Sequence, residues 1–266
     1  MEKYTDIYFD SDKAKEMFPN EVISEAIFEN CRFFELVDYT FANCKFKGTT
    51  KIDHCIEVGI RDSRAKGEVI ISNSEEIGII DCDFNIVNVV RGEMEDFTII
   101  DCRIEELVFE NKRLNECFIK SCDVTKLTIR ETEVENLSIS TSEVYKFDLE
   151  EADVKELDFH KTESQYFYAM QTEIEYAYIY KSQIDRFEVE GSDFNNVNIK
   201  QMNIVYLAFD YCYMRDCEFL NSEINTFIIN NTQFIDCYAE KLSIKSGLID
   251  NDRFTSVDDV MQKILG

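Results

Sequence analysis

The chain has 266 residues, of which 45% are hydrophobic and 13% aromatic, and its formal net charge at pH 7 is −26. This length allows one large domain or two small ones with a sizeable core, and the apolar content argues against a disordered chain despite the charge. The excess of acidic residues disfavours direct binding to nucleic acid or to an anionic membrane, because such contacts need Lys and Arg, and it favours a basic partner or a partner that itself binds nucleic acid.

Residues 1–25 precede the repeat that dominates the chain, and we expect them to cap its first coil. The N-terminus lacks the apolar core of a signal peptide. No stretch of the sequence is apolar over the roughly 18–20 residues that a membrane span needs. We therefore expect a cytoplasmic protein that does not bind membranes.

Residues 26–250 carry a ten-residue repeat, which is clearest between Asp81 and Lys241. Positions whose numbers end in four and nine are apolar, those ending in seven are mostly large and apolar, and those ending in two are mostly small. The apolar spacing thus alternates between two and three residues, which fits neither a helix nor a plain strand. It predicts short extended segments joined by corners, four of which close a coil of about 20 residues.

Cysteines recur at the small positions of this repeat, as at Cys82, Cys102 and Cys122, where other repeats have Ser, Thr or Ala. Free Cys fills a protein core well, and the sequence has no CxxC pair. We predict buried, reduced thiols rather than disulfides or metal ligands.

The recurring pattern is a small residue, any residue, Leu or Phe, and two further residues. Clear examples are Cys31-Arg32-Phe33, Cys82-Asp83-Phe84 and Ser192-Asp193-Phe194. This pattern resembles that of pentapeptide-repeat proteins, which implies an all-β fold, a right-handed four-sided parallel β-helix. Well-understood members of that family resemble B-DNA in shape and charge, dimerise through a C-terminal element and bind DNA topoisomerases. The resemblance implies no catalytic residues.

The repeat changes phase twice near its start, so we expect residues 34–39 and 47–66 to depart from regular coils. The second of these segments contains several glycines together with Arg61, Arg64 and Lys66. These basic residues are candidates for a protruding recognition loop. A repaired insertion without a role is the alternative.

Residues 254–266 are predicted to form a short amphipathic α-helix. Apolar residues from Val257 to Leu265 follow helical spacing, Ser256 suits the N-cap, and Asp258 suits the first turn. The helix either covers the open end of the coil stack, where an exposed edge invites aggregation, or pairs with its copy in a homodimer.

Acidic residues occupy many outward positions of the repeat, where stacked carboxylates would repel one another. The opposite corner carries the basic residues Lys120, Lys161, Lys181, Lys200 and Lys241. This segregation favours a docking face for a basic groove, and a merely soluble surface is the alternative. The candidate acidic face consists of Glu93, Glu95, Asp96, Glu116, Glu133, Glu135, Asp153, Glu156, Glu173, Glu175 and Asp193.

Tyrosines gather at outward positions of a single coil. We interpret them as an aromatic interaction patch, because Tyr is favoured where proteins bind one another. Shielding of neighbouring strands is the alternative. The residues are Tyr166, Tyr168, Tyr176, Tyr178 and Tyr180.

Motifs of catalysis are absent from the sequence. The histidines, His54 and His160, lie far apart in the repeat, and no phosphate-binding glycine loop, HExxH or GxSxG motif occurs. We expect a non-enzymatic protein without cofactor or metal.

We interpret the chain as an interaction protein whose acidic, rod-like surface mimics nucleic acid. Its expected partner is a DNA-binding protein, namely a topoisomerase or a restriction- or defence-type enzyme. The alternative is a scaffolding β-helix that recruits a protein partner through the exposed tyrosines or the caps.

Overall fold

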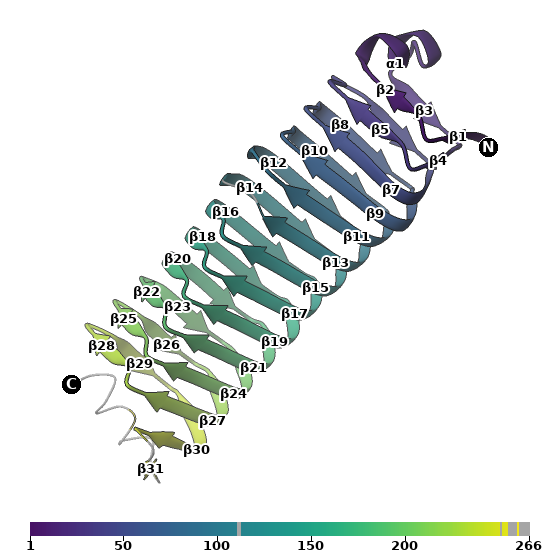
Figure 1. The fold of residues 1–266 in the computed structure, drawn as a ribbon. Coiled ribbons are helices and arrows are strands. Elements are labelled where there is room, and N and C mark those ends of the chain that lie inside the picture. The colour runs from purple at the N-terminus through teal and green to yellow at the C-terminus, as the bar shows by residue number, and fades with distance from the viewer. Residues whose placement is uncertain (111–112, 251, 255–259, 261–266) are drawn as a thin grey trace. The chain divides into compact units, whose positions relative to one another are not determined.

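The computed structural model describes residues 1–110, 113–250, 252–254 and 260. Two compact units divide the chain, residues 1–133 and residues 134–266, and each is described by itself. Both are nearly all-β and wind as parallel β-solenoids with about 20 residues per coil, as the repeat predicts (Figure 1).

The strands of the first unit belong to two parallel sheets, here called sheet A and sheet B. Sheet A contains, in order of pairing, β1 (Glu2–Thr5), β4 (Ala26–Glu29), β7 (Lys45–Asp53), β9 (Arg64–Ser72), β11 (Asp83–Val90), β13 (Arg103–Glu110) and β15 (Asp123–Arg130). The short strand β2 (Tyr8–Phe9) pairs with β5 (Arg32–Phe34), which pairs with β7. Sheet B contains β3 (Val22–Ser24), β6 (Thr40–Ala42), β8 (Ile56–Arg61), β10 (Glu75–Ile80), β12 (Glu93–Ile100) and β14 (Arg113–Lys120).

The second unit has the same two-sheet organisation, and β16 (Glu133–Ser140) belongs to it from Val134 onward. Its sheet A contains β17 (Glu143–Glu150), β19 (Glu163–Met170), β21 (Gln183–Glu190), β24 (Asn203–Asp210), β27 (Glu223–Asn230) and β30 (Ser243–Ile249). Its sheet B contains β16, β18 (Asp153–His160), β20 (Glu173–Tyr180), β22 (Asp193–Asn195), β25 (Tyr213–Arg215) and β28 (Gln233–Ile235), with β23 (Val197–Lys200), β26 (Glu218–Leu220) and β29 (Tyr238–Glu240) continuing beside them.

The first 25 residues, which the sequence predicts to be a cap, supply β1, β2, β3 and the helix α1 (Ser11–Met17). The side chain of Asp10 caps this helix by accepting a hydrogen bond from the backbone N–H of Lys13 at 2.9 Å. Ala14 of the helix and the adjacent Phe9 are fully buried, and the Phe9 ring stacks on Phe33 with centroids 5.1 Å apart.

The predicted C-terminal helix falls almost entirely on residues 255–259 and 261–266, which lie outside the described residues. The backbone of β31 (Asp252–Phe254) pairs antiparallel with β30. Within the part of the chain that the structure describes, no helix is both long enough and apolar enough to cross a membrane.

Columns of identical or similar apolar residues fill the core, as the repeat predicts. In the second unit, Phe147, Phe167 and Phe187 stack on successive strands of sheet A with centroid distances of 4.9 Å and 4.5 Å. All three are at most 1% exposed. Burying one such ring contributes about 1.5–3 kcal/mol, so each coil stabilises its neighbours through the same column.

Many corners between strands contain a single residue in the left-handed conformation. The angle φ is +51° at Glu151 and Lys161 and +50° at Gln171, while glycine takes the equivalent position at 191. The backbone N–H of Glu151 donates to a carbonyl of the next coil, that of Met170, at 2.9 Å. Hydrogen bonds between coils thereby hold a conformation that costs roughly 1–2 kcal/mol in a residue other than glycine.

The coils that follow the N-terminal segment are shorter than the later ones. Ile27 lies beside Lys45, which is 18 residues further on, and Lys45 lies beside Arg64, which is 19 residues further on. The phase changes at residues 34–39 and 47–66 reflect these shorter coils. The expectation of a protruding loop at 47–66 is wrong, because β7, β8 and β9 contain most of the segment.

Two glycines explain how these shorter coils stack. Gly67 of β9 lies directly beside Gly48 of β7, whose φ is +62°. A Cβ atom at position 67 would lie 2.1 Å from the carbonyl oxygen of Gly48, and backbone cannot move aside as a side chain can. The approach of β7 to β9 therefore requires glycine at this position.

We expect Gly67→Ala to lower the free energy of unfolding by about 2–3 kcal/mol, because the added methyl group meets backbone. Gly78→Ala in β10 is the matched control, since a Cβ there would meet no atom within 4 Å. The control should be unchanged or more stable by up to about 1 kcal/mol. Urea unfolding followed by circular dichroism measures both, and equal losses would contradict the steric argument.

Candidate interaction surfaces

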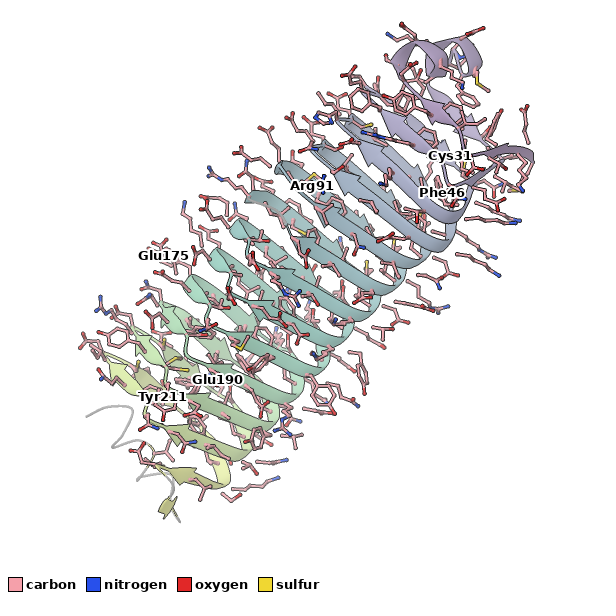
Figure 2. All side chains as sticks on the ribbon, viewed as in Figure 1. Cys31, Phe46, Arg91, Glu175, Glu190 and Tyr211 are labelled. Carbon is pink, nitrogen blue, oxygen red and sulfur yellow. The ribbon has the colours of Figure 1, made fainter. Side chains whose placement is uncertain are left out.

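The residues of the predicted acidic face all lie on strands of sheet B. In the first unit the members lie on β12, β14 and the first residue of β16, namely Glu93, Glu95, Asp96, Glu116 and Glu133. In the second unit they lie on β16, β18, β20 and β22, namely Glu135, Asp153, Glu156, Glu173, Glu175 and Asp193. Within each unit, the repeat thus brings them to one sheet, and Glu175 points away from the core (Figure 2).

In the first unit, carboxylates follow one another on consecutive coils and form what we call the acidic column: Asp38, Glu57, Glu76, Asp96 and Glu116. Asp96 is the direct neighbour of Glu116, and the flanking pairs of β8, β10 and β12 place Glu57 beside Glu76 and Glu76 beside Asp96. Asp38 follows the bridge between Val37 and Ile56. All five carboxylates are exposed.

Crowding in this column affects the titration of its central member. Partial desolvation and the negative charges of Glu57, Asp96 and Glu95 raise the pKa of Glu76. Like charges on adjacent strands are unfavourable for folding, so stability alone does not explain the arrangement. Sequence analysis missed Asp38, Glu57 and Glu76, because the shorter first coils shift them out of the ten-residue numbering.

In the second unit a cation interrupts the corresponding face. Lys155 pairs with Glu135 through its ammonium group. That hydrogen bond and the nearby charges of Glu135, Glu175 and Glu156 raise the pKa of Lys155. The predicted residues of this unit are therefore partly neutralised by the protein itself.

Sheet A of the first unit distributes its charges differently, because opposite charges face each other across strands β13 and β15. Lys126 pairs with Glu106 at 3.1 Å and Arg130 with Glu110 at 3.2 Å. Exposed pairs of this kind contribute only about 0.2–1 kcal/mol each. They nevertheless show that neighbouring coils can neutralise each other, which the acidic column does not do.

The basic residues predicted to lie on a recognition loop lie on strands, on both sheets. Arg61 ends β8 in sheet B, whereas Arg64 and Lys66 belong to β9 in sheet A. In the register of sheet A, Arg64 is the direct neighbour of Lys45 and Lys66 that of Lys47. We call Lys45, Lys47, Arg64 and Lys66 the basic patch.

The tyrosine patch predicted from the sequence is divided between the two sheets of the second unit. Tyr166 and Tyr168 lie on β19 in sheet A, and Tyr176, Tyr178 and Tyr180 lie on β20 in sheet B. The physical reason is that ten residues are half a coil, so residues separated by ten lie on different sheets. The prediction of one aromatic patch is wrong.

Tyr176 and Tyr178 line a shallow hollow of about 500 Å³ on sheet B of the second unit. The hollow is acidic, with Glu156, Asp158 and Glu218 among its lining residues. Burial raises the pKa of Asp158. Aromatic rings beside carboxylates suit a cationic group.

A second hollow of about 480 Å³ lies on sheet A of the same unit and is lined by Tyr166, Tyr168 and Tyr206. The hydroxyl of Tyr168 donates to Glu190 at 2.9 Å, and burial together with this bond raises the pKa of Tyr168 to about 12. The guanidinium of Arg186 lies 4.7 Å from the centre of the Tyr206 ring.

Acceptor oxygens in this sheet A hollow are buried and receive no hydrogen bond from the described residues. They are the Oδ1 atoms of Asp148, Asp210 and Asn230. The side chain of Asp148 is 1% exposed, and its other oxygen accepts a hydrogen bond from Lys146 at 2.5 Å. An unmatched buried acceptor costs about 1–3 kcal/mol, so the hollow suits a partner that supplies N–H or O–H groups.

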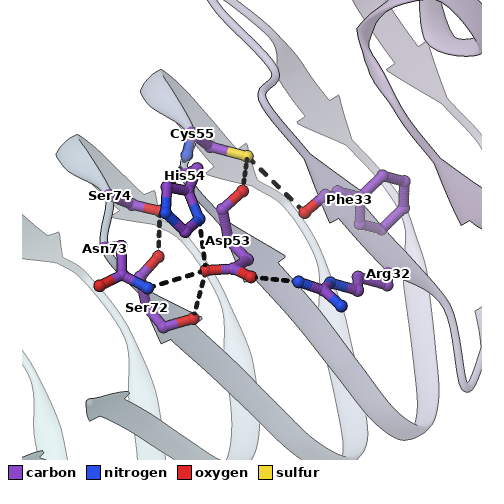
Figure 3. A network of polar contacts seen from close by, with 8 residues as sticks. All are labelled: Arg32, Phe33, Asp53, His54, Cys55, Ser72, Asn73 and Ser74. Carbon is purple, nitrogen blue, oxygen red and sulfur yellow. Dashed lines mark hydrogen bonds and ion pairs between the residues drawn. The ribbon is translucent and has the colours of Figure 1, made fainter. Parts of the chain in front are cut away.

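A polar network in the first unit ties three consecutive strands of sheet A together around Asp53, at the end of β7 (Figure 3). Its carboxylate accepts hydrogen bonds from Arg32 at 2.5 Å, Ser72 at 2.8 Å and Asn73 at 3.1 Å. The Nδ1 atom of His54 lies 3.0 Å from the same carboxylate. Burial opposes the charge on Asp53, but these donors outweigh it and lower the pKa to about 2.

This network does not have the arrangement of a nucleophilic catalytic site. Ser72 donates to Asp53 rather than to His54, so the histidine is not placed to activate the hydroxyl. The neighbouring Cys55 is buried, and burial raises the pKa of its thiol to about 11. The geometry indicates a corner that is held together by hydrogen bonds.

Every cysteine of the chain is free and buried, as predicted from the repeat. The thiol of Cys102 donates to the carbonyl of Ile100 at 3.1 Å, and burial raises the pKa of Cys212 to about 11. Among the described residues, no group of three or more His, Cys, Asp or Glu side chains is arranged to hold a metal ion.

No family model matches the chain, and neither a curated protein nor a solved structure is similar to it at a significant level. The resemblance to pentapeptide-repeat proteins therefore depends on the sequence pattern. The parallel solenoid with about 20 residues per coil is consistent with it.

Asp53→Asn should lower the free energy of unfolding by about 2 kcal/mol at neutral pH, the value of a pKa lowered from about 4 to about 2. A lowered pKa stabilises the fold above the ordinary pKa of the group, and this stabilisation is lost as pH falls toward 2. The gap between wild type and variant should therefore close on acidification. Unfolding in urea over a pH series measures it.

The control for this experiment is Glu76→Gln, which removes a carboxylate whose pKa is raised instead. It should not destabilise the protein at neutral pH. A gap between wild type and Asp53→Asn that is independent of pH would contradict the role of the charge.

Proposed function

We propose that the protein is a non-enzymatic interaction protein of the pentapeptide-repeat type, a right-handed four-sided β-helix without a cofactor. In this proposal the acidic surface of sheet B mimics the phosphates of nucleic acid. Its partner is a DNA-binding protein, such as a topoisomerase or a restriction- or defence-type enzyme. The acidic column of the first unit carries the proposal.

The column supports this function through its regular repetition, one carboxylate per coil, and through the like charges that face one another along it. Strands in a sheet lie about 4.8 Å apart, so one column gives one carboxylate per coil at that interval. Duplex DNA carries one charge per roughly 1.7 Å of its axis. Acidic residues beside the column, Glu75 and Glu95, add charge on the same strands, while Glu93 lies beside Arg113. A groove lined by Lys and Arg would thus meet a dense line of exposed anions.

A second candidate function is recruitment of a protein partner through the tyrosines of the second unit. The buried acceptors in the sheet A hollow favour it, because Asp148, Asp210 and Asn230 each leave an oxygen without a hydrogen bond from the described residues. A partner loop that carries N–H donors would satisfy them while packing on Tyr168 and Tyr206. This function would not depend on the acidic column.

The triple variant Glu57→Gln, Glu76→Gln and Asp96→Asn tests the first proposal. Wild-type protein should inhibit supercoiling by DNA gyrase or cleavage by a restriction enzyme, and added salt should weaken the inhibition because counterions screen it. The triple variant should lose at least tenfold in inhibitory potency. The assay measures the protein concentration that halves enzyme activity.

The control for this test changes net charge equally on other surfaces, with Asp83→Asn, Glu105→Gln and Glu131→Gln. It should retain wild-type potency. Equal loss in both triple variants would assign the effect to net charge, and absence of inhibition by wild type across a panel of DNA-binding enzymes would overturn the proposal.

The second candidate predicts a different pattern of loss. Tyr168→Ser combined with Tyr206→Ser should abolish capture of a partner that wild type retains, whereas Tyr176→Ser combined with Tyr178→Ser on sheet B should not. Affinity purification with quantitative mass spectrometry compares the two double variants. If the partner is lost only with the acidic-column variant, recruitment through the sheet A hollow is excluded.

A further inference from the structure

The basic patch is an unusual feature in a chain whose formal net charge is −26. Lys45 and Lys47 are separated by one residue on β7, and so are Arg64 and Lys66 on β9. In the sheet, Lys45 is paired with Arg64 and Lys47 with Lys66. All four side chains are exposed. No residue in the described part of the chain forms an ion pair with any of them, although Glu29, the sheet neighbour of Lys47, pairs with Lys3 at 2.6 Å.

Acidic residues flank the patch in sheet A, with Glu29 beside Lys47 and Asp83 beside Arg64. Within the patch itself, the pairing of β7 with β9 is electrostatically unfavourable. Lys45 is directly opposite Arg64 and Lys47 directly opposite Lys66, and like charges in such positions are unfavourable. Gly48 and Gly67, which follow Lys47 and Lys66, bring the two strands into close contact. On β13 and β15 of the same sheet, opposite charges face each other instead.

A complementary surface exists on the same unit, but it faces the other way. The acidic column runs along sheet B, while the basic patch lies on sheet A. Rings from both sheets pack between them: Phe41 of sheet B lies 4.7 Å from Phe33 of sheet A, measured between centroids. One molecule therefore cannot bring its own patch to its own column.

We propose that the basic patch of one molecule docks on the acidic column of a second copy of this chain. Both surfaces are built on consecutive coils, so both present their charges at the same interval of about 4.8 Å. When two molecules lie side by side with their coils aligned, the two cations on one strand of the patch face one carboxylate of the column. The crowded pair Glu76 and Asp96 gains most, because a cation there offsets mutual repulsion.

Because the two surfaces lie on opposite sides of the unit, the contact cannot be reciprocal. Such a heterologous contact leaves one free patch and one free column at the ends, so copies add in series rather than stopping at a dimer. The net negative charge of each copy opposes association, but at physiological salt it is screened beyond about 8 Å. Association is therefore weak, requires high protein concentration and disappears again at high salt.

A second copy is a better occupant than an external nucleic acid. In a second copy, the carboxylates of the column repeat once per coil, as the basic residues of the patch do. A long polyanion would also meet the acidic residues that surround the patch. This inference does not depend on the proposed binding of a DNA-binding protein, although both use the acidic column.

Two charge-reversal variants test the proposal. The patch variant carries Lys47→Glu and Lys66→Glu and keeps the acidic column, while the column variant carries Glu76→Lys and Asp96→Lys and keeps the basic patch. Sedimentation velocity at physiological salt should show that the average mass of wild type rises beyond that of a dimer as concentration increases. Each variant alone should remain monomeric.

Mixing the two variants gives the decisive result. The patch variant supplies only a column and the column variant only a patch, so the mixture should form one-to-one dimers and nothing larger. A control with Lys161→Glu and Lys181→Glu changes charge equally in the second unit and should assemble like wild type. Circular dichroism of each variant verifies that it is folded.

The proposal is overturned if wild type stays monomeric over the whole concentration range, or if folded variants associate as wild type does. It is also overturned if the mixture stays monomeric. Retention of wild type on a heparin column without self-association would assign the patch to an external polyanion instead. These outcomes are independent of any effect on gyrase or restriction enzymes.

Discussion

Hydrogen bonding between coils is the constraint on which the rest of the structure depends. Except for β31, which pairs antiparallel with β30, the strands pair in parallel with strands of the neighbouring coil. The corner residues extend the pairing, as when the N–H of Lys161 donates to the carbonyl of Tyr180 at 3.0 Å. Because of this ladder, a residue lies directly beside the residue one coil further along the chain. A residue type that recurs at one position of each coil therefore forms a column of side chains along the unit.

Columns have opposite consequences inside and outside the solenoid. In the core, repetition is favourable, because Phe147 packs on Phe167 and each ring removes its neighbour from water. On the surface, repetition of charge is unfavourable unless signs alternate. Sheet A of the first unit alternates signs at Glu106 and Lys126, whereas the acidic column and the basic patch do not. In the second unit, Asp153, Glu173 and Asp193 also lie beside one another without alternation of sign. Folding stability does not explain such runs of like charge.

Sequence reasoning could predict the all-β solenoid, the coil length, the buried cysteines and the core columns, because in the regular coils numbering alone reproduces the register. It failed where the register shifts. Because the early coils are one residue shorter, Asp38, Glu57 and Glu76 do not share the last digit of Asp96, and the column was not recognised. The same shift of register made the segment with Arg64 and Lys66 resemble a loop. The register of β7 and β9, with Gly48 directly beside Gly67, shows that these coils stack closely. The predicted tyrosine patch failed for a different reason. Tyr166 and Tyr176 are half a coil apart and therefore lie on different sheets.

The two units present different chemistry at equivalent positions. Following Glu116, the acidic position of sheet B recurs in the second unit as Glu156, but its next neighbours on the ladder are Tyr176 and Asn196. The five-residue acidic column belongs to the first unit, and the second unit has the shorter line of Asp153, Glu173 and Asp193. Aromatic hollows with Tyr168 and Tyr178 belong to the second unit. Electrostatic docking and aromatic recruitment therefore do not compete for the same residues. If another copy occupied the acidic column, a DNA-binding protein could not dock there, while the tyrosine hollows of the second unit would stay accessible. Self-association would then inhibit the first function without affecting the second.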